Sequence, residues 1–141
     1  MRRAAVLFVI ASVINYPWEV GQMPLYLGDK SWLQSAVHCL IPSLGDGAIV
    51  LLIFLCGLLV FRRAGWADRP GLAGYALMLA SGAALSVFIE WGAVHVLQRW
   101  SYAAGMPQLP GFNVGVVPVL QMLLLPPLVF RLTARWLGGR R

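Results

Sequence analysis

Four long apolar segments follow one another along the chain and predict four membrane-spanning helices. Crossing about 30 Å of hydrocarbon takes roughly 20 helical residues. The segments of this length cover about 4–27, 35–61, 72–97 and 114–132. The repeated ten-residue alternation typical of a membrane β-barrel does not occur. The pattern therefore predicts an all-α fold, a four-transmembrane-helix bundle that forms one integral membrane domain over residues 1–141.

The first segment contains polar residues that would normally end a membrane helix. The apolar run AAVLFVIASVI is followed by NYPWEVGQMPLY, which brings Pro17, Glu19 and Gln22. A cleaved signal peptide would carry a small-x-small site after the run, and NYPWEV has none. We therefore expect a retained, kinked first span with a carboxylate inside the membrane.

Composition and charge narrow the class of protein. Of 141 residues, 60% are hydrophobic and 11% charged, whereas a soluble domain has about a quarter charged residues. The net charge of +6 does not indicate nucleic-acid binding, because the basic residues lie at segment ends and form no stripe. Cys39 and Cys56 form no CxxC or CxxCH motif, which leaves redox, zinc and c-type haem motifs unsupported.

The basic residues also predict the orientation in the membrane. Nine of the eleven fall on one predicted side, including Arg2, Arg3, Arg140 and Arg141, and only Lys30 and Arg99 fall on the other. Positively charged loops stay in the cytoplasm. The sequence therefore predicts a membrane protein with both termini cytoplasmic.

Polar side chains gather in the outer half of the predicted bundle. At 1.5 Å per helical residue, Glu19 and Asp46 lie about 22 Å above the cytoplasmic boundary and Glu90 about 27 Å above it. A charge at bilayer depth costs about 2.5–3.5 kcal/mol, so such residues face the interior and pair. We therefore expect catalytic roles for Glu19, Glu90 and Asp46. The residues expected to bind a ligand lie beside them: Trp18, Gln22, Trp91, Tyr102 and Gln121.

Each of these residues also has a structural explanation. Glu19 and Glu90 are suited to hydrogen bonds between helices, and Asp46, between two glycines, is suited to cap a helix fragment. His38 and His95 fall near the outer interface, where a solvated histidine is ordinary. These separate explanations do not account for the shared depth of the three carboxylates in the predicted membrane.

The motifs resemble those of a group of small, four-span hypothetical membrane proteins from bacteria. That group has WE-x-x-Q-x-PLY in the first helix, HC then GD in the second and EW in the third. A W-x-Y…MP-x-x-P loop and a G-x-x-P-x-x-Q motif follow. The chain carries these motifs from Trp18 to Gln121, with SYAAGMP one residue longer in the loop. The resemblance implies the four-helix membrane fold in a bacterial inner (cytoplasmic) membrane, and no particular activity.

Three functions remain open at this point. The first is binding or transformation of a hydrophobic small molecule, such as an isoprenoid, quinone or lipid, by carboxylate acid–base chemistry beside indole rings. The second is a non-catalytic accessory subunit of a larger membrane complex. The third is a haem or divalent metal held by His38 and His95. A channel is disfavoured, because the inner half of the membrane has no matching polar path.

Overall fold

The computed structural model describes residues 2–28 and 31–138. Residues 1, 29–30 and 139–141 and the side chain of Trp32 lie outside this description, as do the predicted charges of Lys30, Arg140 and Arg141. The long helices are α1 (Arg2–Gln22), α3 (Leu40–Phe61), α4 (Gly71–Trp91) and α5 (Val116–Gly138). The short elements are η1 (Met23–Leu25), α2 (Trp32–His38), η2 (Ala64–Ala67), the π-helical turn η3 (Gly92–Val96), β1 (Gln108–Leu109) and β2 (Val114–Gly115).

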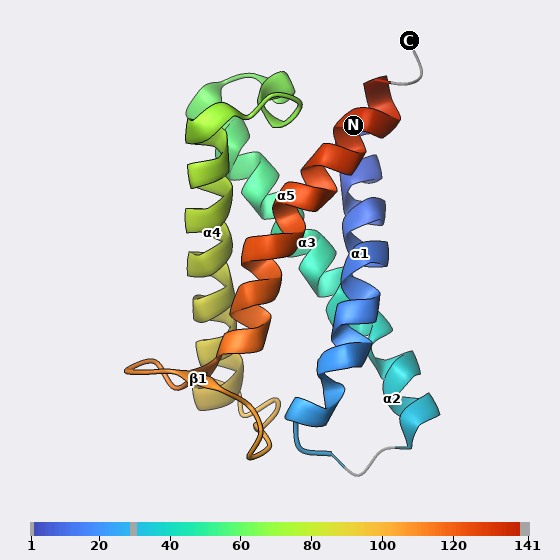
Figure 1. Ribbon diagram of the computed structural model, residues 1–141, viewed down its shortest axis with the longest axis vertical. Helices are drawn as coiled ribbons and strands as arrows, with labels where there is room; N and C mark the ends of the chain where they lie inside the picture. The colour runs from blue at the N-terminus through green and yellow to red at the C-terminus, as the bar shows by residue number, and fades with distance from the viewer. Residues whose placement is uncertain (1, 29–30, 139–141) are drawn as a thin grey trace.

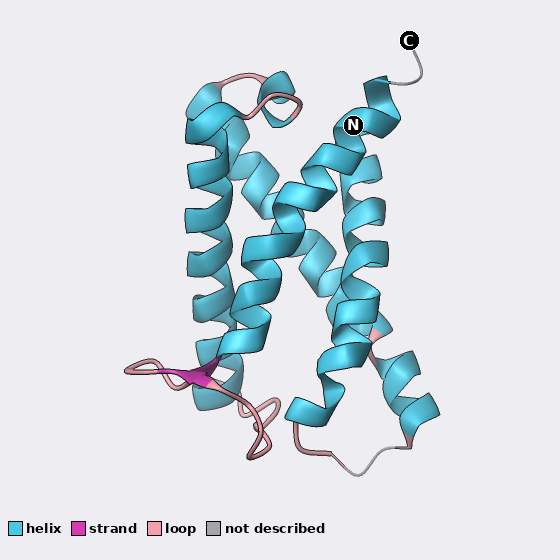
Figure 2. Ribbon diagram, in the orientation of Figure 1, coloured by secondary structure: helices cyan, strands magenta, loops and turns pink. Residues whose placement is uncertain are grey.

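The long helices form a bundle in which α1 packs against α3 and α5, and α4 packs against the same two helices. Figure 1 shows the start of α1, the end of α5 and the η2 loop at one end of the bundle, which we call the termini end. The α1–α2 loop and the β1–β2 hairpin lie at the opposite end, the hairpin end. Figure 2 shows that strand is confined to this small hairpin. The predicted all-α fold with four long helices is confirmed.

Four helical stretches of the described chain are long and apolar enough to cross a membrane: Arg2–Leu25, Leu33–Phe61, Gly71–Val96 and Val116–Gly138. Two of these stretches differ clearly from the predicted spans. The second stretch is interrupted by a turn at Cys39, between α2 and α3. The last stretch continues six residues beyond 132. Arg131 and Arg135 are exposed on the surface of α5, so these charged residues do not end the helix. α1 runs without interruption through Pro17 to Gln22.

The core at the termini end is apolar and closely packed. Trp66 of η2 lies against Phe54 and Phe130, with ring centroids 6.2 and 5.4 Å apart. Gly57 makes this possible, because a Cβ there would lie 2.1 Å from Cζ2 of Trp66. On α4, a Cβ at Gly82 would lie 2.3 Å from the carbonyl oxygen of Met122. Glycine at these two positions allows the elements to approach closely.

The two loops at the hairpin end are joined by backbone hydrogen bonds. The amide of Leu27 donates to the carbonyl of Ser101, and the amide of Ala103 donates to the carbonyl of Leu25, both at 2.9 Å. Tyr26 and Tyr102 are thereby paired as in an antiparallel ladder. This pairing joins the segment after α1 to the segment after α4 across the end of the bundle.

Candidate functional site

The buried face of α1 changes from apolar to polar toward the hairpin end. Leu7 and Ala11 are buried at the termini end, and Asn15, Glu19 and Gln22 continue the same face at steps of four, four and three residues. These spacings place all five side chains on one side of a helix. The helix therefore buries an apolar half and a polar half against the same neighbours.

Gln121 of α5 is at the centre of the polar region and is 1% exposed. Its Nε2 donates to Oδ1 of Asn15 and to Oδ2 of Asp46, both at 2.8 Å. Its Oε1 accepts a longer hydrogen bond, at 3.4 Å, from Nε2 of Gln22. Gln121 thus connects α1, α3 and α5 through hydrogen bonds that are shielded from solvent.

Glu19 and Asp46 lie within hydrogen-bonding reach of each other across the α1–α3 interface. Oε1 of Glu19 also accepts a 2.6 Å hydrogen bond from Nε2 of Gln22. The structure therefore brings two carboxyl groups from different helices into one amide-lined cluster.

Two buried polar atoms on α1 residues close to Glu19 in sequence have no hydrogen-bond partner within the described chain. They are Oε1 of Gln22 and Nε1 of Trp18, and both atoms are buried. Buried polar atoms in folded proteins nearly always have a hydrogen-bond partner. The cluster therefore offers one acceptor and one donor to a polar group brought by a ligand.

Glu90 lies in the last turn of α4, before the chain changes to the π-helical turn η3. Its Oε2 accepts hydrogen bonds from the Tyr102 hydroxyl at 2.5 Å and from Nε1 of Trp100 at 3.4 Å. The Tyr102 hydroxyl in turn accepts from the amide of Gly115 at 2.9 Å. Burial and then the hydrogen bond to Glu90 raise the pKa of Tyr102, so this hydroxyl stays a donor.

Aromatic rings cover the carboxyl groups at the hairpin end. Tyr26 lies 5.6 Å from Tyr102 and 6.3 Å from Trp100 between ring centroids, edge-on to the indole. Burial, followed by the nearby charges of Glu90 and Glu19, raises the pKa of Tyr26. Tyr26 is therefore close to both parts of the cluster.

The predicted site residues are thus only partly brought together. The structure gathers Glu19, Asp46, Gln22 and Gln121 in one cluster and joins Glu90 to Tyr102 next to it. Trp100 and Tyr26 also belong there, although neither is among the site residues that the sequence predicts.

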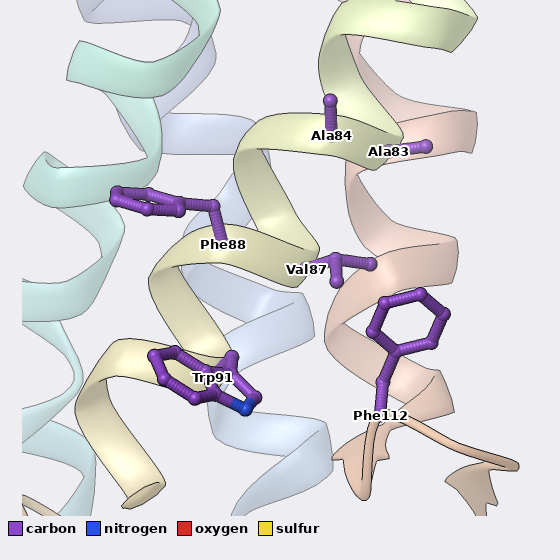
Figure 3. Close-up of a pocket in the computed structure, with 6 residues that line it drawn as sticks. All are labelled: Ala83, Ala84, Val87, Phe88, Trp91 and Phe112. Atoms are coloured by element: carbon purple, nitrogen blue, oxygen red, sulfur yellow. The ribbon is translucent and has the colours of Figure 1, made fainter. Parts of the chain in front are cut away.

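Trp91 lies apart from this cluster. It is 46% exposed and faces an apolar groove of about 550 Å³ on the outer side of α4. Figure 3 shows its indole beside Phe88, Val87 and Phe112. Consecutive helical residues point about 100° apart, which explains why Glu90 is buried while its neighbour is not.

His38 and His95 are both exposed. The elements that carry them, α2 and η3, lie on opposite sides of the bundle in Figure 1. Nε2 of His95 donates to the carbonyl oxygen of Asn113 at 3.1 Å. Within residues 2–28 and 31–138, no three His, Cys, Asp or Glu side chains are grouped as metal ligands. The arrangement gives no support to a haem or metal held by the two histidines.

Comparison with known proteins yields no matching family model, curated protein or solved structure. The function is therefore argued from the geometry of the site.

Proposed function

We propose that the chain is an inner-membrane protein that binds a hydrophobic substrate, such as an isoprenoid, quinone or lipid, and transfers protons to and from it. The site is the cluster of Glu19, Asp46 and Glu90 at the hairpin end, in the outer half of the membrane. The observation that carries the proposal is the contact between Glu19 and Asp46 in the buried polar half of the bundle.

Membrane insertion is supported by the outer surface of the bundle. Large apolar side chains face outward on all four long helices, among them Leu59, Leu72 and Phe88, which are 77%, 89% and 73% exposed. A soluble protein rarely exposes so much contiguous apolar surface. The basic residues Arg3, Arg63 and Arg69 flank the helices at the termini end, in agreement with cytoplasmic termini.

The carboxyl pair supports acid–base chemistry. Two adjacent negative charges in an apolar interior are strongly unfavourable, so Glu19 and Asp46 retain a proton between them. A carboxylic acid in a dry site keeps its proton at neutral pH and can deliver it to a bound substrate, and the neighbouring carboxylate is a base. The pair thus supplies both partners of a proton transfer within one site.

The reaction that fits is isomerisation or cyclisation of a double bond. The π electrons of the alkene take the proton from the acid and form a new C–H bond, which leaves a carbocation on the adjacent carbon. Loss of a proton from a neighbouring carbon to a carboxylate then forms the new double bond. No atoms are gained or lost overall and no oxidant is required. The faces of Tyr26, Trp100 and Tyr102 suit a cationic intermediate.

The unpaired atoms of Gln22 and Trp18 support a substrate with one polar end. A hydroxyl group can donate to the buried oxygen of Gln22, and a hydroxyl or carbonyl oxygen can accept from the buried indole N–H of Trp18. This fits a polyprenyl alcohol or a quinone better than a plain hydrocarbon.

The test is to identify what the protein holds. The protein is purified in a mild detergent, extracted with organic solvent and analysed by mass spectrometry, as wild type and as Glu19→Gln and Asp46→Asn. The control is Ser81→Ala, which removes a hydroxyl that donates to a carbonyl of its own helix α4, outside the cluster. We expect one hydrophobic compound to purify with the wild type and the control. The amount of this compound is expected to fall about tenfold or more in the other two variants.

Two results would count against the proposal. One is a well-folded wild type that carries no such compound and instead purifies with a stoichiometric partner subunit. The other is unfolding of both cluster variants, detected by thermal melting, which would favour a purely structural role for the carboxyl pair.

A further inference from the structure

A second site is indicated at the termini end, far from the carboxyl cluster. A groove of about 440 Å³ lies between the start of α1, the loop before α4 and the last turns of α5. Its charged lining residues are Arg3, Asp68, Arg69 and Arg135. Three guanidinium groups face one carboxylate, which leaves the groove with a surplus of positive charge.

The carboxylate is already paired. Arg3 and Asp68 form a two-pronged ion pair, in which Nη2 of Arg3 lies 2.8 Å from Oδ2 of Asp68. This pair joins α1 to the loop before α4 and holds the Arg3 side chain at the groove. Arg69 and Arg135 are exposed, and neither forms an ion pair with a carboxylate of the described chain. Two guanidinium groups therefore remain available for an anion.

The groove also has an apolar wall. Ala134 and Leu137 of α5 line it beside the arginines. Guanidinium groups next to aliphatic side chains match a phosphodiester that is joined to a glycerol and its acyl chains. A free phosphate ion makes no use of the apolar wall.

We propose that this groove binds the headgroup of an anionic glycerophospholipid. The phosphodiester contacts Arg69 and Arg135, and the glycerol lies against Leu137. With cytoplasmic termini the groove lies at the level of the inner-leaflet headgroups, where a basic pocket between spans attracts anionic lipid. The inference rests on the proposed membrane insertion and is independent of the chemistry at Glu19.

The experiment titrates the full-length protein in detergent with phosphatidylglycerol, phosphatidylcholine or inorganic phosphate, and counts bound molecules by native mass spectrometry. The variant is Arg69→Gln/Arg135→Gln. The matched control is Arg62→Gln/Arg63→Gln, which removes the same charge from exposed residues of the same end outside the groove. We expect phosphatidylglycerol to bind the wild type and the control in preference to phosphatidylcholine, and the variant to lose about tenfold or more in affinity.

Three outcomes would overturn the inference. They are an unchanged lipid preference in the groove variant, an equal loss in the control, and phosphate binding as tight as phosphatidylglycerol binding. Alkaline carbonate extraction of the expressing membranes tests insertion separately. A result that contradicts lipid binding in the groove is therefore distinguishable from one that contradicts membrane insertion or the proposed function of the carboxyl cluster.

Discussion

Gln121 of α5 donates a hydrogen bond from Nε2 to Oδ2 of Asp46 of α3 at 2.8 Å. The same amide nitrogen donates its other hydrogen to Asn15 of α1 at 2.8 Å. One buried side chain therefore holds three helices at the level of the carboxyl pair. Its two donor hydrogens are both used, which fixes the orientation of the amide and of the groups around it.

Replacing Gln121 by leucine is expected to destabilise the protein. The change leaves Asn15 and Asp46 without this buried donor, which costs about 1–3 kcal/mol for each unsatisfied group. Thermal melting of the purified protein measures the effect. Leu124→Ala, which shortens an outward-facing side chain that is 57% exposed on the same helix, is the control. An equal or smaller loss in Gln121→Leu than in the control would contradict the role of the amide.

Close packing predicts opposite effects for glycines on the same helix. Gly57→Ala forces a Cβ into the Trp66 ring, and overpacking of this kind costs about 1–3 kcal/mol. Gly45→Ala meets no atom within 4 Å, so it is expected to be neutral or slightly stabilising, because alanine favours helix. Melting temperatures of the two variants, compared with the wild type, check the prediction. Similar values for both would show that the Trp66 contact is looser than described.

The stability of the hairpin end is expected to fall at alkaline pH. The pKa of Tyr102 is raised by burial and by its hydrogen bond to Glu90, whereas an unfolded tyrosine titrates near pH 10. Above that pH the unfolded state loses the proton first, so the free energy of unfolding decreases as pH rises. Tyr102→Phe removes this part of the dependence and leaves the part due to Tyr26.

Melting curves between neutral pH and pH above 10 check this prediction. Tyr75→Phe, at the termini end and 42% exposed, is the matched control. A Tyr102→Phe protein whose melting temperature falls with pH as steeply as that of the control would count against a protonated Tyr102 bound to Glu90.

The proposed orientation is tested independently of any ligand. A C-terminal fusion to alkaline phosphatase is expected to be inactive in cells, and the same fusion to a fluorescent protein is expected to be bright. A single cysteine placed at Pro110, which is exposed at the hairpin end, should react with a membrane-impermeant thiol reagent added outside. Active phosphatase at the C-terminus would reverse the assignment of the cluster to the outer half.

The sequence predicts the helices and much of the polar cluster, because both depend on regular geometry. Asn15, Glu19 and Gln22 share a face through helical spacing alone. The common depth of Glu19 and Asp46 follows from the rise per residue. The cost of burying polar groups in lipid then predicts that they face inward.

The remaining parts depend on loop paths that have no such periodicity. The pairing of Tyr26 with Tyr102 requires the chain to return across the hairpin end, and neither loop carries a repeating pattern. Trp100 donates to Glu90 only because the π-helical turn and the following residues bring it back over α4. Trp91 was assigned to the site by its adjacency to Glu90 in sequence, and the helical rotation directs it outward instead.

Transfer of a proton between the carboxyl cluster and a hydrophobic substrate is the central claim, and deuterium incorporation measures it most directly. Purified protein is incubated in heavy water with a total lipid extract of the expressing membranes, and carbon-bound deuterium is measured by mass spectrometry. The account predicts incorporation into one hydrophobic compound by the wild type and Ser81→Ala, and a loss of at least about a hundredfold in Glu19→Gln and Asp46→Asn. Absence of incorporation by the folded wild type, or equal incorporation by all four proteins, would contradict it.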